Sequence, residues 1–173
     1  MALLKVKSFN YFINEKKVKK IHPDIELARS LLKNIQEREE TTLKLEPKEF
    51  HLIVFENLYD CLRELLDAIL ALDGYKSYSH EAVIIYLKNF NFPENKIFDL
   101  NRFRIKRNNS KYYGNSPKVE DVLEIKKFYR KKFTNKFDAL ILAVSHQQYL
   151  KLSPNYFNKI LKEDSVVFDV KNL

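Results

Sequence analysis

Several residue types are scarce in this chain of 173 residues, and each scarcity excludes a kind of structure or chemistry. The single cysteine, Cys61, cannot form a disulfide within the chain, and its place in an apolar helical pattern predicts a small buried side chain. The two glycines, Gly74 and Gly114, lie far apart, which excludes the glycine-rich loop that binds dinucleotide phosphates. No apolar run reaches the roughly 18 residues that cross a membrane, and the first residues show no signal-peptide pattern. We therefore expect a cytoplasmic protein.

The few glycines and prolines mark the ends of helical patterns. Both glycines follow a long helical pattern, at the position where a left-handed backbone is favoured. Each of the five prolines stands where a helix can begin. The apolar periodicity between these residues predicts about five helices, and their short connections favour an antiparallel bundle. The predicted helices cover about residues 23–40, 47–73, a third that begins at Ser79, 93–114 and 117–133, after a basic N-terminal arm with one helical turn near Phe9 to Phe12.

The pattern changes at Thr134. Residues 138–144 and 165–170 are apolar runs of strand length, and a helical stretch over about 146–162 lies between them. This order predicts a βαβ unit with a parallel strand pair. Two strands do not make a stable sheet alone, so we expect this tail to pack on the helices, pair with another chain, or be a remnant of a larger sheet. The prediction is a mainly α bundle over 1–133 with a βαβ appendage over 134–173.

Positive charge is concentrated in one segment. Residues 101–132 hold eleven Lys and Arg against three acidic residues, so this segment alone carries the net charge of +8 of the whole chain. A localised basic segment is typical of a surface that binds an anion such as RNA. Alternatively, these side chains form the solvated face of a helix. The candidate contacts to phosphate are Arg102, Arg104, Lys106, Arg107 and Lys111.

Four strings of residues in the helical part stand out together. They are Ala28 to Leu32, Tyr59 to Leu65, Gly74 to Ala82, and Arg104 to Asn108 followed by Tyr112-Tyr113-Gly114. Over about residues 20–132, they make the chain resemble the HEPN superfamily in its archaeal minimal form. The resemblance implies a helical bundle that dimerises and often stands beside a small nucleotidyltransferase as a toxin and antitoxin pair. Catalytic members of that superfamily are metal-independent ribonucleases, which use an Arg, four to six variable residues and a His.

This sequence departs from the catalytic pattern where the His is expected. The positions after Arg107 that should hold it are Tyr112, Tyr113 and Gly114. A tyrosine, with a pKa of about 10, does not replace imidazole as a general acid or base near neutral pH. Arg107 and Asn108 could still contact a phosphate, with Tyr112 supplying a hydroxyl. Tyr112 and Tyr113 could stack on bases, or they could cover the core with their hydroxyls exposed.

His80 is the imidazole that could complete such a site if the bundle brings it near Arg107. Its position in the first turn of a helix is equally compatible with a structural role. Glu64 could orient Arg107 through a charge-assisted ion pair, or it could serve as the partner of another charge. No pair of histidines has the spacing of metal ligands with a carboxylate, so we expect no metal.

The tail carries a second resemblance. Phe137 to His146 and Val166 to Leu173 are similar to the end of the UDP-glucose/GDP-mannose dehydrogenase family, in the Rossmann-like domain that binds the nucleotide sugar. The chain has no dinucleotide-binding glycine loop, and Cys61 belongs to the helical part, so we expect neither dehydrogenase activity nor a cofactor.

These observations predict a HEPN-type binding module, associated with RNA or with a small nucleotidyltransferase in a toxin–antitoxin or defence system, and without catalysis of its own. The alternative is a metal-independent ribonuclease. A second alternative is a fragment related to the UDP-sugar dehydrogenases that is inactive as an oxidoreductase. The expected partners are RNA, a small nucleotidyltransferase and a second copy of the chain in a homodimer, with no membrane contact.

Overall fold

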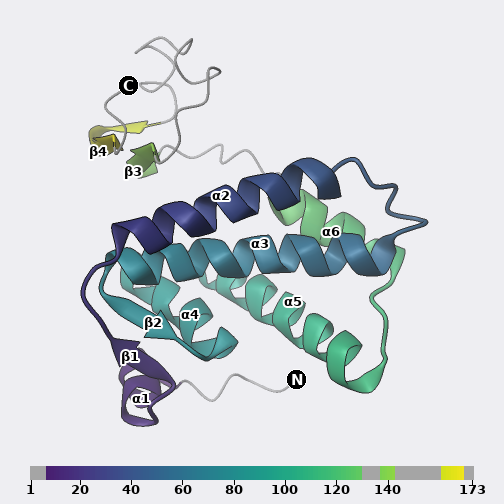
Figure 1. Ribbon diagram of the computed structural model, residues 1–173, viewed down its shortest axis with the longest axis horizontal. Helices are drawn as coiled ribbons and strands as arrows, with labels where there is room; N and C mark the ends of the chain where they lie inside the picture. Colours follow the sequence, from purple (N-terminus) through teal and green to yellow (C-terminus); the bar gives the residue numbers. More distant parts are fainter. Residues whose placement is uncertain (1–6, 130–136, 143–160, 170–173) are drawn as a thin grey trace. The chain divides into compact units, whose positions relative to one another are not determined.

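The structure is a computed structural model that describes residues 7–129, 137–142 and 161–169. The chain divides into two compact units, Met1–Tyr129 and Arg130–Leu173. The first unit is mainly helical, as the sequence predicts (Figure 1). Within the described ranges, no helix has the length and apolar character that crossing a membrane requires.

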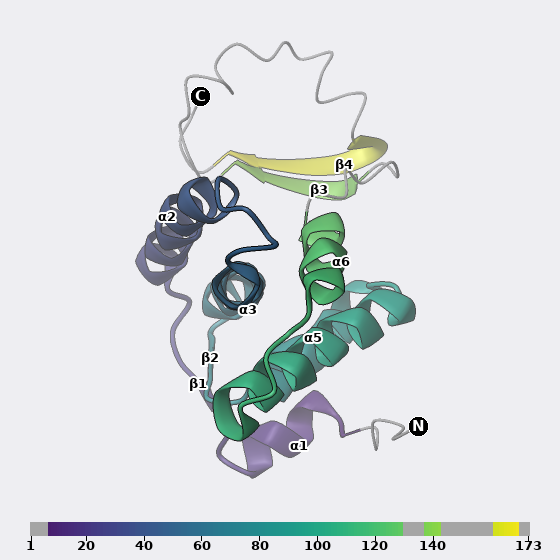
Figure 2. The ribbon, with the colours of Figure 1, turned by 90° about the vertical axis from the view of Figure 1, so that its right-hand side faces the viewer.

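The long helix α3 lies at the centre of the first unit. Figure 2 looks along this helix and shows α2, α5 and α6 arranged around it. The elements in chain order are α1 (Phe9–Asn14), β1 (Val18–Lys20), α2 (Ile25–Thr42), α3 (His51–Leu72), β2 (Tyr75–Ser77), α4 (His80–Tyr86), the 3-10 helix η1 (Leu87–Phe90), α5 (Glu94–Tyr113) and α6 (Val119–Tyr129).

The core explains why α3 is central. Its wide apolar face packs against α4, α5 and α6, and Phe55 and Phe103 meet edge to face with ring centroids 6.2 Å apart. Each fully buried large apolar side chain contributes about 1.5–3 kcal/mol relative to exposure. The buried residues of this cluster are Val54, Phe55, Leu58, Tyr59, Leu62, Leu66 and Leu70 of α3, Val83, Ile84 and Tyr86 of α4, Leu87 of η1, Ile97, Leu100 and Phe103 of α5, and Val122 and Ile125 of α6.

Local sequence signals fix the helix ends. The Asp24 carboxylate accepts a hydrogen bond from the Leu27 N–H at 2.8 Å, and the Ser79 hydroxyl accepts one from the Ala82 N–H. These bonds satisfy backbone donors that have no partner within the helix. At the C-terminal ends of α3 and α5, the two glycines adopt the left-handed backbone that the sequence predicts for them.

The N-terminal segment differs from the expected arm. Helix α1 packs into the unit, where Phe12 is 1% exposed, and strand β1 pairs antiparallel with β2, with Val18 opposite Ser77. Phe12 and Val18 share a small apolar cluster with Ala82 and Ile85 of α4. Burial of these apolar side chains holds the segment against the rest of the unit, in place of the basic arm that the sequence suggested.

The second unit contains β3 (Phe137–Leu142) and β4 (Leu161–Asp169). They pair in parallel, with Ala139 opposite Val166 and Ile141 opposite Phe168, so the predicted parallel pair is confirmed. The helix expected between them, over about 146–162, lies mostly outside the described residues. Its last two residues belong instead to β4, because this strand begins at Leu161.

Candidate functional site

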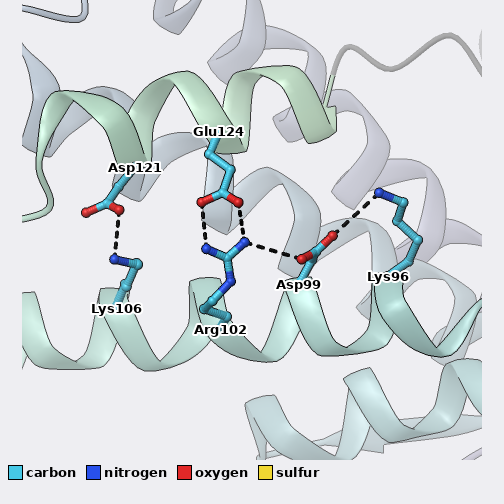
Figure 3. A network of polar contacts seen from close by, with 6 residues as sticks. All are labelled: Lys96, Asp99, Arg102, Lys106, Asp121 and Glu124. Atoms are coloured by element: carbon cyan, nitrogen blue, oxygen red, sulfur yellow. Dashed lines mark hydrogen bonds and ion pairs between the residues drawn. The ribbon is translucent and has the colours of Figure 1, made fainter.

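Arg102 and Lys106, two of the residues predicted to contact phosphate, join α5 to α6 through ion pairs (Figure 3). Arg102 forms a two-point ion pair with Glu124, with Nη1 2.6 Å from Oε2, and its Nη2 lies 3.3 Å from Asp99 Oδ1. Lys106 Nζ lies 2.7 Å from Asp121 Oδ1. Acids within the unit therefore balance the charges of Arg102 and Lys106.

The pKa values of the two α6 acids reflect these contacts. The hydrogen bonds from Arg102 lower the pKa of Glu124, despite some burial. Burial opposes ionisation of Asp121, but hydrogen bonds from Lys106 and from the Lys118 N–H lower its pKa overall. Both groups are therefore carboxylates in the folded protein at neutral pH.

A ladder of ion pairs follows the contact between α3 and α5. Lys111 Nζ lies 2.7 Å from Glu56 Oε2, and Ser110 also donates a hydrogen bond to that carboxylate. About one turn further along both helices, Arg107 Nη2 lies 3.7 Å from Asp60 Oδ1. The ladder shows that α3 and α5 run antiparallel and that one acid of α3 faces one cation of α5 at each of these levels.

Asp60 takes the role that the sequence suggested for Glu64. The Glu64 carboxylate instead lies 2.8 Å from Arg38 Nη1 of α2, so the expectation that Glu64 orients Arg107 is wrong. The reason is the direction of the side chains on α3. Positions 60 and 64 are four apart, but Glu64 is turned toward α2, whereas Asp60 faces α5. Burial raises the pKa of Asp60, and the nearby Arg107 opposes this rise.

The next level of the ladder has a guanidinium on each helix. The same register brings Arg104 of α5 to the level of Arg63 of α3. Arg104 Nε donates a hydrogen bond to the neutral Asn101 side chain at 2.9 Å, and Arg63 forms an ion pair with Asp67 of its own helix. Among the described residues, Arg104 has no carboxylate partner.

Tyr59 and His80 lie beside these guanidiniums. The Tyr59 hydroxyl and His80 Nδ1 are 2.8 Å apart, and the two rings are nearly parallel, with an interplanar angle of 5°. The Arg107 guanidinium lies over the Tyr59 ring, 5.9 Å from its centroid. His80 and Arg107 therefore both contact Tyr59, and the structure brings together these two predicted site residues.

Burial, together with the charges around the pair, determines the protonation of His80 and Tyr59. Burial and the charges of Arg63, Arg107 and Arg104 lower the pKa of His80 to about 4. Burial raises the pKa of Tyr59 to about 12, although the same arginines oppose this rise. At neutral pH, the imidazole and the phenol are therefore both uncharged and surrounded by three cations.

Some guanidinium donors in this cluster have no partner. Arg63 Nε and Arg107 Nε are buried and make no hydrogen bond within the part of the chain that the structure describes. A buried donor without a partner costs about 1–3 kcal/mol, so such a group needs an explanation, and a bound ligand is one. The cluster of Tyr59, Arg63, His80, Arg104 and Arg107, which we call the arginine cluster, is therefore the candidate site.

The remaining predicted residues lie at the end of α5. Tyr112 and Tyr113 are 73% and 74% exposed, which excludes the alternative that they cover the core. Asn108 is half-buried, and Gly114 ends the helix with a positive φ. In the ranges that the structure covers, no group of three His, Cys, Asp or Glu side chains could hold a metal ion.

Sequence reasoning missed Tyr59 and Asp60 as site residues and gave Arg63 no role. A signal for them exists. Asp60 and Arg63 interrupt the apolar pattern of α3, and Tyr59 and Arg63 are four residues apart, so they share one face of the helix.

No known protein family, curated protein or solved structure gives a significant match to this chain. The interpretation of the arginine cluster therefore depends on its geometry and chemistry.

Proposed function

We propose that the chain is an RNA-binding module of the HEPN type, without catalysis of its own. The observation that supports this function best is the arrangement of α5. The helix presents Arg104, which has no carboxylate partner among the described residues, close to Arg107 at the arginine cluster. It then ends in two tyrosines whose rings are largely exposed.

These two features fit the two chemical parts of a single-stranded RNA. Guanidinium groups bind phosphate oxygens through charge-assisted, often bidentate hydrogen bonds. Exposed aromatic rings stack on bases without strong sequence preference, contributing about 1–3 kcal/mol per base. Arg102 and Lys106 have a different role in this proposal, since their contacts with Glu124 and Asp121 hold α6 against α5.

The charge component is tested by fluorescence anisotropy with a labelled oligouridylate at several salt concentrations. Because each neutralised phosphate releases counterions, affinity should fall steeply with salt. The double variant Arg104→Ala/Arg107→Ala should bind at least about tenfold more weakly, with a shallower salt dependence. Lys33→Ala on α2 is the matched control, because it removes an exposed cation elsewhere and should bind normally. Binding that ignores both salt and the double variant would contradict the proposal.

The stacking component is tested separately at Tyr112 and Tyr113. Replacing both with Ala removes the rings and should weaken binding by about tenfold or more, whereas replacing both with Phe keeps the rings and should preserve affinity. Equal losses in the two double variants would show that the hydroxyls, and not the rings, contact the RNA.

A metal-independent ribonuclease is the second candidate, because His80 and Arg107 meet at Tyr59. General acid–base catalysis is most effective when the pKa of the catalytic group is near the working pH. The low pKa of His80, about 4, makes it a poor proton acceptor in the free protein at neutral pH, which favours binding without cleavage. An RNA cleavage assay in EDTA decides between the two. Robust cleavage that disappears in Arg107→Ala and His80→Gln would establish the ribonuclease.

A further inference from the structure

One level of the ladder between α3 and α5 has a guanidinium on both helices, those of Arg63 and Arg104. At the neighbouring levels, an acid of α3 compensates a cation of α5, as in the pairs Glu56–Lys111 and Asp60–Arg107. In the same register, Arg63 occupies the position of α3 where an acid would complete the series, and Arg63, Arg104 and Arg107 all act electrostatically on Tyr59 and His80. Like charges gathered around one site disfavour the folded state unless an anion compensates them.

The local charge balance leaves a deficit of negative charge. The arginine cluster contains three guanidiniums, of Arg63, Arg104 and Arg107. Two carboxylates compensate them, Asp67 and Asp60, and the second is 3.7 Å away, too far for a good hydrogen bond. The Nε donors of Arg63 and Arg107 have no partner in the described residues. One tetrahedral oxyanion carries the charge and the acceptor atoms that this arrangement lacks.

We propose that Arg63, Arg104 and Arg107 form a subsite for one phosphate group of a bound RNA, and that His80 takes up a proton when this phosphate binds. This inference rests on the proposed RNA-binding function and deepens it. It assigns the phosphate to the arginine cluster of α3 and α5 and makes RNA affinity dependent on pH.

The proton uptake follows from the groups that face His80. Tyr59 and Arg63 face it from α3, and Arg104 and Arg107 act on it from α5. Its neighbour in α4, Glu81, is paired with Lys7. Burial and the three arginines hold the pKa of the free imidazole at about 4. An anion bound to the arginines offsets their repulsion of an imidazolium, so the pKa of His80 rises in the complex.

The protonation of His80 requires no reactant other than solvent. The proton comes from solvent and converts the neutral imidazole to imidazolium. Nδ1–H then donates to the Tyr59 hydroxyl, which already lies 2.8 Å from Nδ1, and Nε2–H is available to an oxygen of the anion. The phosphodiester keeps its single negative charge, and no bond to phosphorus is formed or broken.

The first experiment uses sulfate as the probe, because its charge is constant between pH 4 and 8. The imidazole signal of His80 is followed by NMR against pH, with and without sulfate, and is identified by its loss in His80→Gln. We expect sulfate to raise the pKa of His80 by about one unit or more. In Arg104→Ala, the pKa should already be higher without sulfate and should respond less to it. A pKa that sulfate leaves unchanged in the wild-type protein overturns the subsite.

The second experiment measures oligouridylate affinity between pH 4 and 8, a range in which uracil does not titrate. Wild-type affinity should increase as pH falls through the pKa that His80 has in the complex, and the total gain should be about tenfold for each unit by which the bound phosphate raises that pKa. His80→Gln should remove this dependence. Arg104→Lys keeps the charge but loses the planar fork, so it should weaken binding while retaining the pH dependence.

The two experiments together separate this subsite from the proposed function. Salt-dependent RNA binding with no pH dependence, unaffected by Arg104→Ala, would place the RNA elsewhere on α5 and overturn the subsite alone. A sulfate-induced rise in the His80 pKa without RNA binding would support the anion subsite and overturn RNA as its ligand. An equal pH dependence in wild type and His80→Gln would overturn the assignment of the proton to His80.

Discussion

Gly74 and Gly114 follow the two longest helices with the same left-handed backbone, but their surroundings differ. Gly74 has a φ of +77°, and a Cβ added there would lie 2.9 Å from the Ile21 carbonyl oxygen. Ile21 directly follows strand β1, and its N–H donates a hydrogen bond to the Gly74 carbonyl, so this backbone is held in place. Gly114 has a φ of +68° and no atom within 4 Å of an added Cβ. A side chain at position 74 would therefore meet both backbone strain and a steric conflict, whereas a side chain at position 114 would meet backbone strain only.

We predict that Gly114→Ala lowers the free energy of unfolding by about 1–2 kcal/mol, the cost of a left-handed residue with a side chain. Gly74→Ala should cost more, because the backbone near Ile21 must also shift. Urea denaturation of both variants measures the difference. Equal losses would show that the contact with Ile21 relaxes freely.

Among single residues, the sequence correctly predicted those whose role depends on the residues next to them in the chain. Gly74, Gly114 and the Ser79 cap were predicted because each follows or begins a clear apolar period. The partners of Arg107 were not predicted. Asp60 and Glu64 are both acids on α3, and only the rotation of this helix in the bundle decides that Asp60 faces α5.

Between elements, the contact of α5 with α6 depends on charge as well as on apolar packing. The Arg102 guanidinium contacts Asp99 one turn earlier in α5 and Glu124 of α6, so it links the two helices (Figure 3). Both partners in the main pair are partly exposed, which limits the stabilisation through screening by solvent.

We predict that Arg102→Ala lowers the free energy of unfolding at pH 7 by about 1 kcal/mol. Arg29→Ala is the control, because the ion pair of Arg29 with Glu26 lies within one exposed helical turn and should contribute less.

The effect of Arg102→Ala should depend on pH. The folded-state pKa of Glu124 is below its unfolded value of about 4.3, so the pair stabilises the fold above that pH. This contribution is lost as pH falls through the folded-state pKa. Denaturant unfolding at pH 7 and near pH 3 should therefore show a difference between wild type and variant that shrinks on acidification. A constant difference would mean that Arg102 stabilises α5 by some other contact.

Helix α5 also presents a short apolar stripe made of two exposed side chains seven residues apart. Phe98 is 55% exposed and Ile105 45%, and residues seven apart lie on one face of a helix. We propose that a second copy of the chain covers this stripe in a homodimer.

We predict that Ile105→Lys raises the dissociation constant of the dimer by at least about tenfold, because a charge would be buried without a partner. Ile53→Lys on α3 is the matched control, since Ile53 is equally apolar and 50% exposed but lies off the stripe. Analytical ultracentrifugation of the three proteins measures the effect. A wild-type chain that stays monomeric at high concentration would contradict the dimer.

The helices were predictable and the short strands were not. The apolar stripes of α2, α3 and α5 repeat over several turns, so their periods stand out in the sequence. Strands β1 and β2 have three residues each, too few for an alternating pattern, and their pairing joins segments that are distant in the chain. Tertiary packing, and not local preference, determines them.

At the scale of the whole chain, the second unit poses the question of what covers its strands. Strands β3 and β4 pair with each other, and no third strand joins them within the described residues. A two-stranded sheet is marginally stable, and open strand edges are normally covered.

We predict that deleting residues 134–173 changes the oligomeric state or lowers the thermal stability of the protein. The helical unit itself should keep its circular dichroism spectrum, because the core clusters of the described residues are built from its own helices. Sedimentation velocity and thermal unfolding of the shortened chain give the measurement. A shortened protein identical in assembly and melting temperature would show that the strands contribute to neither.

The pairing of β1 with β2 has a consequence for the order of folding. It closes a loop that contains all of α2 and α3, and the entropy of closing a long loop must be offset by contacts already formed inside it. The packing of α2 on α3 joins neighbouring segments and can form first. The β1–β2 pair and the docking of α1 should therefore be late events, and the N-terminal segment the first part of this unit to open in the native state.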